Sequence, residues 1–351
     1  MIITNNKVEV LDLTCDYIDT LKMVERCGRE CYKSSDKMTD DSHIRFLKMI
    51  SLRGHTSVLE HGVIYFYTPN LNGLLNKLFE SSLSAKEYAH DIGHVNIHQF
   101  KEKKGAFLSM NLRTIYEGFN GSLKHIHEEM LKYDKYNGDL LFSRSIFDES
   151  LPLSIININT LWTTDRTTTQ SLVRHRVMGI SQESTRYCNY SKDKFGSDVS
   201  VILPTTKDLD KRLIGKSSEN KITCNVAKDR LEWGSGAIVN VSNISHVEEN
   251  MIKQLCKSCD SYIELINVEN YSPDDARVVL PFYTASNIYL SGTMYDWFRN
   301  DNPTKGFVNL RSHHTAHNVV RNLTNNQLVP KIESIFGISR EDIQKEIMDY
   351  N

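Results

Sequence analysis

The feature that most constrains this chain is a short basic segment near its middle. The run Arg174-His175-Arg176 is followed, after seven residues, by Ser184-Thr185-Arg186-Tyr187. Three guanidiniums and an imidazole this close together repel one another unless an anion lies among them, and the planar guanidinium matches a phosphate with two hydrogen bonds. The fold must therefore hold this segment at an anion site or leave it as a solvated basic turn. We favour the anion site.

Because the overall charge of the chain is close to zero, any bound anion must be held by local clusters of basic residues. The 351 residues include 42 Lys and Arg against 44 Asp and Glu, a formal net charge of -2. This balance provides no global positive field for nucleic acid or an anionic membrane surface, so we expect neither as a partner. No apolar run approaches the ~18 to 20 residues of a membrane span, and no signal layout is present at the amino end. We therefore predict a cytoplasmic location.

The cysteines are odd in number and scattered, at positions 15, 27, 31, 188, 224, 256 and 259. This spacing is typical of reduced thiols rather than of a disulfide framework. Cys256 and Cys259 form a CxxC, but no second CxxC or spaced His pair accompanies it, and both lie within a helical pattern. We predict no metal site.

Local patterns predict a mixture of helices and strands. Ile44, Leu47 and Ile50 indicate a helix that starts after Asp40-Asp41 and ends near Gly54. Strands are expected over 63–67, 106–116 and 153–163 because β-branched and aromatic residues gather there.

The clearest helix starts at Ser245, which forms a capping box with Glu248. Its apolar stripe runs through Val247, Met251, Leu255, Cys259, Tyr262 and Ile266. A short helix follows from Ser272 through Arg277 and stops at Pro281.

The order of these elements is too irregular for a doubly wound sheet, and no glycine-rich phosphate loop is present. We predict an α+β fold, an antiparallel sheet flanked by helices, in a single main domain over 1–351. Insertions are expected at about 70–160 and 206–240, and the segment 206–236, rich in Lys, Asp, Ser and Asn, is interpreted as a surface insertion.

Three further groups could carry chemistry. The first spans His55 to His61 and contains Ser57 and Glu60; two histidines and a carboxylate suggest a metal site, but their spacing does not place them on one helical face, and a packing histidine is the commoner case. The second, Asp274 to Pro281, contains Arg277, which could simply pair with Asp274 one helical turn away. The third is Arg311 with the histidines after it, which could form a solvated helix face.

Together and in this order, the four groups resemble those of the flavin-dependent thymidylate synthases. That family is recognised by RHRx7S, which matches Arg174 to Ser184, and by segments similar to His55–His61, Ala276–Pro281 and Leu310–Arg311. The resemblance covers roughly residues 20 to 325. It implies an enzyme that transfers a one-carbon unit from methylenetetrahydrofolate to C5 of dUMP and reduces it to a methyl group, with FAD as cofactor and NADPH as reductant, without a cysteine nucleophile.

The resemblance also implies roles for particular residues. FAD would contact Arg174, His175, Arg176 and Val177, together with His55, Ser57 and Glu60. The dUMP site would use Arg174, the run Gln182, Glu183, Ser184, Thr185 and Arg186 from a neighbouring subunit, and Arg277 at the phosphate. Arg311 would lie against the uracil ring and favour its ionised form, which makes it the catalytic residue. Shared sites of this kind imply a homo-oligomer, and the family suggests a tetramer.

Some positions depart from the family pattern. The flavin-contacting NxR should fall at Thr293 and Tyr295, which offer neither an amide nor a guanidinium, and Arg299 is the nearest candidate to compensate. Thr315 occupies a place where relatives have His, with His314 beside it. Two alternatives stay open: a related enzyme that delivers a hydroxymethyl group or uses another pyrimidine nucleotide, and a nucleotide-binding module without catalysis.

Overall fold

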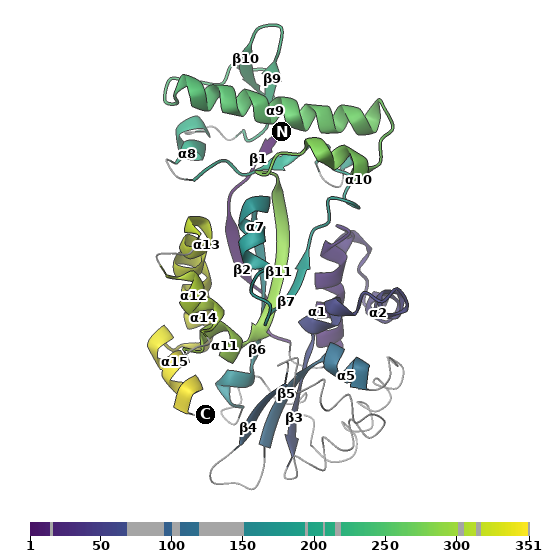
Figure 1. The fold of residues 1–351 in the computed structure, drawn as a ribbon, viewed down its shortest axis with the longest axis vertical. Coiled ribbons are helices and arrows are strands. Elements are labelled where there is room, and N and C mark those ends of the chain that lie inside the picture. Colours follow the sequence, from purple (N-terminus) through teal and green to yellow (C-terminus); the bar gives the residue numbers. More distant parts are fainter. Residues whose placement is uncertain are drawn as a thin grey trace. The chain divides into compact units, whose positions relative to one another are not determined.

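The computed structural model describes residues 1–14, 17–68, 95–99, 106–118, 151–193, 196–205, 208–214, 219–300, 305–313 and 317–349 (Figure 1). The chain divides into two compact units. Unit 1 comprises Met1–Lys7, Trp162–Leu172 and Gln182–Ile288, and unit 2 comprises Val8–Leu161, Val173–Ser181 and Tyr289–Asn351. The expectation of a single main domain with two insertions stays a prediction.

Unit 1 is built around one long helix, α9 (His246–Asn267). The antiparallel hairpin of β9 (Ile222–Asn225) and β10 (Arg230–Trp233) lies against it (Figure 1). The remaining elements are the parallel pair β1 (Ile2–Ile3) and β8 (Ser200–Val201), helices α7 (Arg166–Leu172), α8 (Leu209–Ile214) and α10 (Pro273–Ala276), and the 3-10 helix η6 (Arg277–Val279).

The predicted start of α9 is confirmed. The Ser245 side chain accepts a hydrogen bond from the Glu248 backbone, and the Glu248 carboxylate accepts one from the Ser245 backbone. This reciprocal pair satisfies two of the free N–H groups at the helix start. Cys259 is buried, as its place on the apolar stripe predicts, but Val247 is 77% exposed, because the stripe reaches the core only after the first turn.

Part of the segment 206–236, interpreted from the sequence as a surface insertion, is packed into the core where the structure describes it. Leu209, Leu213, Ile222, Leu231 and Trp233 are all buried in one cluster with the inner face of α9. Polar residues dominate its composition, but the apolar ones recur at the spacing of a short helix and a hairpin. That spacing, rather than the average polarity, determines burial.

Unit 2 begins with a helical layer and a small sheet. Its elements are α1 (Tyr17–Glu30), η1 (Ser35–Lys37), α2 (Ser42–Leu52), η2 (Thr56–His61), β3 (Val63–Thr68), β4 (Val95–Gln99), β5 (Ala106–Asn111) and α5 (Leu112–Gly118). The strands form an antiparallel sheet in the order β3-β5-β4 (Figure 1). The helix predicted to end near Gly54 is confirmed as α2. Ile44, however, is 56% exposed, and only Leu47 and Ile50 of its predicted stripe are buried.

The strand predicted over 106–116 is wrong in its second half. It ends at Asn111, and a helix starts at Leu112. The side-chain Oδ1 of Asn111 accepts hydrogen bonds from the backbone nitrogen and the hydroxyl of Thr114, at 2.8 and 3.0 Å. An Asn side chain that caps a helix in this way ends the strand, although the apolar residues continue beyond it.

The carboxyl-terminal part of unit 2 is helical. It contains α11 (Met294–Phe298), α12 (Phe307–Arg311), α13 (Asn318–Leu323), the π-helix η7 (Thr324–Leu328), α14 (Val329–Phe336) and α15 (Arg340–Asp349). Trp297 is fully buried, and its ring lies edge-on to Phe307 at a centroid distance of 4.9 Å. Asn309 donates hydrogen bonds to the carbonyls of Phe298 and Arg299 and so joins α12 to α11.

A further sheet has the strand order β2-β6-β11-β7, formed by β2 (Lys7–Val10), β6 (Asn157–Asp165), β11 (Ala285–Thr293) and β7 (Gly179–Gln182). The strand predicted over 153–163 is thus confirmed as β6, but its first residues form the 3-10 helix η4 (Leu153–Ile155). The mixed class with antiparallel sheets is confirmed; the pair β1-β8 is parallel. None of the helices in the described ranges is both long and apolar enough to cross a bilayer.

Candidate active site

The basic run lies in the turn that leads from α7 to β7. Arg174 and Arg176 are exposed, as expected for a turn, whereas His175 is 7% exposed. The His175 ring packs edge-on against Phe307 at 5.2 Å. The side chain of His175 is therefore packed in the core of unit 2, and this packing holds the arginines on either side of it at the surface.

Two more arginines of unit 2, Arg299 and Arg311, lie close to His175. Burial, and after it the positive charges of Arg311 and Arg299, lower the pKa of His175 to about 4. The pKa of Arg311 is in turn lowered by burial and by the charge of Arg174. Within the described residues neither Arg174 nor Arg299 forms an ion pair with a carboxylate, and the buried Nε of Arg299 has no hydrogen-bond partner. We refer to Arg174, Arg299 and Arg311 around neutral His175 as the arginine cluster.

The arginine cluster is arranged to attract an anion. Like charges lower one another's affinity for protons, and an anion among them relieves that repulsion. Aromatic rings lie under two of the guanidiniums: Tyr295 under Arg299 at 5.3 Å and Phe307 under Arg311 at 5.9 Å. The solvated-turn interpretation describes Arg174 and Arg176 alone, and it does not account for two arginines that arrive from α12 and the end of α11.

The second motif forms the 3-10 helix η2 and the residue before it. His55 and Ser57 are exposed, and the His55 Nδ1 lies 3.2 Å from the Tyr32 hydroxyl. Glu60 instead accepts a hydrogen bond from Arg113, which also bonds Glu117 at 2.8 Å. The two carboxylates raise the pKa of Arg113 although burial opposes them. Arg113 was not anticipated from the sequence.

His61 is a packing residue, as the commoner case predicts. It is fully buried, with Nδ1 2.6 Å from the Ser291 hydroxyl and Nε2 2.8 Å from the Ser181 hydroxyl. Burial lowers its pKa to about 3, so it is neutral at physiological pH. A neutral imidazole donates to one serine and accepts from the other. Across the described part of the chain, no three His, Cys, Asp or Glu residues are grouped to hold a metal ion.

The two buried histidines predict acid destabilisation. Between pH 6.5 and about 4 the unfolded chain protonates both imidazoles while the folded chain keeps them neutral. Each should therefore remove up to about 1.4 kcal/mol of unfolding free energy per pH unit as the pH falls through this window. Urea unfolding at pH 7.5, 6.0 and 5.0 would measure the slope. His61→Gln, which can still bond both serines, should flatten it; an unchanged slope would contradict the assignment.

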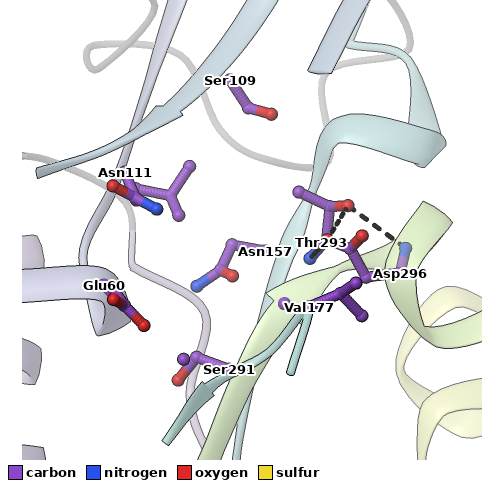
Figure 2. A pocket seen from close by; sticks show the side chains of 11 residues that line it. Glu60, Ser109, Asn111, Asn157, Val177, Ser291, Thr293 and Asp296 are labelled. Carbon is purple, nitrogen blue, oxygen red and sulfur yellow. Dashed lines mark hydrogen bonds between the residues drawn. The ribbon is translucent and has the colours of Figure 1, made fainter. Parts of the chain in front are cut away.

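A polar pocket lies in unit 2 between η2, β5 and β11. It measures about 320 Å³, counting space open to solvent. Three residues that the resemblance assigns to FAD line it, namely Glu60, Val177 and Thr293. Figure 2 shows the amide of Asn157 near its centre, with Asn111 on one side and Thr293 and Asp296 on the other.

The Thr293 side chain is committed to the start of α11. Its hydroxyl donates to Asp296 Oδ2 at 2.7 Å, and the Asp296 backbone donates to the same hydroxyl. This capping box holds the pocket wall. A threonine side chain has no amide, so the group that the family pattern expects at this position is missing. Thr315 and His314 lie outside the described residues.

Unit 1 contains the rest of the predicted nucleotide site. The Gln182 amide donates to Thr169 Oγ1 at 2.9 Å and to Ser286 Oγ at 3.2 Å. Glu183 is buried and accepts from the Tyr190 hydroxyl at 2.7 Å. The Ser184 hydroxyl accepts from the Arg186 backbone, and Thr185 is buried. These bonds fix the backbone that carries Arg186.

Arg186 and Arg277 share one carboxylate in unit 1. Asp274 lies 3.1 Å from Arg186 and 2.8 Å from Arg277. The pairing of Arg277 with Asp274 that its helical spacing allows is therefore present. Two guanidiniums beside a single carboxylate have a net charge of +1. All three side chains are at least 39% exposed, so an anion can reach them.

A comparison with protein families identifies the chain. The family model described as thymidylate synthase complementing protein matches residues 108–330. The chain belongs to this family, the flavin-dependent thymidylate synthases. The match begins within the expected insertion at 70–160 and contains both groups of arginines.

Other comparisons add less to this family assignment. No curated protein matches the sequence. Two solved structures of the UMP/dUMP methylase PolB from Streptomyces cacaoi are similar: the complex with 5-Br UMP has a TM-score of 0.37 at 11% identity and covers 99% of this chain and 97% of that one. The complex with 5-Br dUMP has a TM-score of 0.36 at 12% identity and covers 97% and 96%. These TM-scores are too low to establish a shared fold.

Proposed function

We propose that this member of the flavin-dependent thymidylate synthase family converts dUMP to dTMP for dTTP synthesis. Methylenetetrahydrofolate would supply the carbon, and NADPH would supply the hydride through FAD. The observation that carries the proposal is the arginine cluster, in which Arg174 and His175 of the RHRx7S motif of the family lie close to Arg299 and Arg311. Three guanidiniums that lie close together suit a phosphorylated ligand, and both FAD and dUMP are anions of this kind.

The residues of unit 2 fit a flavin dinucleotide. Arg174 and Arg299 of the arginine cluster offer guanidiniums for a pyrophosphate, and the polar pocket next to Glu60, Val177 and Thr293 offers amides and hydroxyls for an uncharged ring. When bound, FAD would accept a hydride from NADPH and pass it on for reduction of the transferred carbon. The contribution of the chain is to bind and orient: His175, neutral and buried, holds the turn that carries Arg174 and Arg176.

The nucleotide would be bound by the arginines that the family resemblance assigns to it. Arg186 and Arg277 would bind the phosphate in place of, or beside, Asp274, and Gln182 to Thr185 would fix that loop. Arg311 would lie against the uracil and stabilise the negative charge that develops on the ring as C5 becomes nucleophilic. In this proposal the Gln182–Arg186 run comes from a neighbouring subunit of a homotetramer.

The test is direct. Purified protein should bind FAD with a visible flavin spectrum that dUMP perturbs, and NADPH oxidation should require dUMP and methylenetetrahydrofolate. Mass analysis of the product should show a methyl group. A hydroxymethyl product would contradict the reduction step and favour a related hydroxymethylase, and a chain that binds dUMP but never takes up FAD would contradict the flavin mechanism.

A further inference from the structure

Three polar side chains of the pocket have no role in the residue set that the family resemblance implies. Ser109 and Asn111 lie on β5, and Asn157 lies at the start of β6; they are 1%, 5% and 3% exposed. All three fall within the segment 70–160, for which the sequence offers no function. They line the pocket together with Glu60, Val177 and Thr293 (Figure 2).

Two of these side chains have unsatisfied polar atoms. Within the described residues, Ser109 Oγ and Asn157 Oδ1 are buried and lack a hydrogen-bond partner. The Asn157 amide is otherwise held, because its Nδ2 donates to Asn159 Oδ1 at 3.3 Å. Buried polar groups in native proteins are nearly always paired, so a ligand that pairs these two atoms would relieve a cost that the chain alone carries.

The third side chain presents a donor. Asn111 Oδ1 accepts both hydrogen bonds from Thr114, so its amide nitrogen is the atom left for another partner. Figure 2 shows that nitrogen turned toward Asn157. The wall thus offers a donor from Asn111, an acceptor from Asn157, and a hydroxyl from Ser109 that can act as either.

The charges on the pocket wall exclude a phosphate as the ligand. Among the residues that the structure describes, the ionisable ones that line it are Glu60 and Asp296, both carboxylates. An uncharged planar ring with N–H beside C=O, a cyclic imide or lactam, complements the donor and acceptor without meeting like charge. The pyrimidine edge of an isoalloxazine has this pattern, whereas adenine has no ring carbonyl.

We propose that Ser109, Asn111 and Asn157 form a subsite that hydrogen-bonds the imide edge of the flavin ring and takes the place of the amide missing at Thr293. This subsite rests on the proposed function, because it assumes that the redox cofactor is a flavin. It assigns a role to part of the segment 70–160: the strand β5 supplies ring contacts.

The test measures binding rather than turnover. We expect Ser109→Ala and Asn157→Leu each to raise the Kd for FAD and for riboflavin about tenfold, by fluorescence titration of the purified chain. The Kd for ADP, which lacks the ring, should change less than about twofold. Because Ser109 Oγ has no hydrogen-bond partner among the residues that the structure describes, Ser109→Ala should not lower the apoprotein Tm.

Ser154→Ala is the matched control, because Ser154 Oγ is also buried and without a partner among the described residues but does not line the pocket. It should leave the Kd for FAD unchanged. Wild-type protein that binds FAD while both pocket variants bind it equally well would overturn the subsite and leave the proposed function standing. Variants that lose dUMP affinity instead would overturn its assignment to the flavin. Wild-type protein that takes up no FAD would overturn the proposed function itself.

Discussion

Replacing Arg311 with alanine should lower kcat/KM for dTMP formation by about 10²- to 10³-fold, the usual cost of removing one preorganised group that stabilises developing charge. Arg311 is suited to this role because its guanidinium is half-buried over Phe307 and lies close enough to His175 to help keep that imidazole neutral. Steady-state kinetics with saturating FAD would separate the loss in kcat from any loss in dUMP binding.

Two variants make this result specific to the Arg311 guanidinium. Arg311→Lys keeps the charge without the planar fork and should recover part of the activity. Cys188→Ala removes the cysteine nearest the motif; because Cys188 is fully buried in the core of unit 1, turnover should be largely intact. If activity fell only in the Cys188 variant, catalysis would depend on a thiolate, and the flavin mechanism would be wrong.

Sequence patterns predicted those parts of the fold that depend on neighbours in the chain. The capping box at Ser245, the buried face of α9 and the strand at Val63 are local features, and their signals are periodicity and capping. The prediction of a strand over the second half of 106–116 was wrong because it also used local signals alone. Its apolar residues continue past Asn111, and only the capping bond to Thr114 shows that the backbone changes there.

The candidate site depends mainly on residues that are far apart in the sequence, which local patterns do not predict. The basic motif can be recognised in the sequence because its charged residues are adjacent. Arg113 and Glu60 are separated by 53 positions, and no local pattern predicts their pairing. The pocket likewise combines residues from η2, β5, β6 and β11. Ser109 and Asn157 are common residue types, and what distinguishes them is one buried oxygen each, Ser109 Oγ and Asn157 Oδ1, that has no hydrogen-bond partner among the described residues.

Trp297→Ala should lower the free energy of unfolding by about 3 to 5 kcal/mol, the range for removing a fully buried large aromatic side chain. The indole packs against Phe307, which in turn packs against His175, so it lies behind the arginine cluster. Its Nε1 donates to the carbonyls of Gly292 and Ile158 at 3.1 and 3.3 Å. Urea denaturation monitored by circular dichroism would measure the change.

The same substitution should also weaken FAD binding, because Gly292 and Thr293 form the pocket wall that the indole supports. Trp297→Phe keeps most of the buried area and loses only the hydrogen bonds, so it should cost about 1 to 3 kcal/mol. Trp233→Ala, a comparable truncation in unit 1, should lower stability without changing the Kd for FAD. If both alanine variants weakened FAD binding equally, the effect would reflect global unfolding, and Trp297 would have no particular role in holding the flavin site.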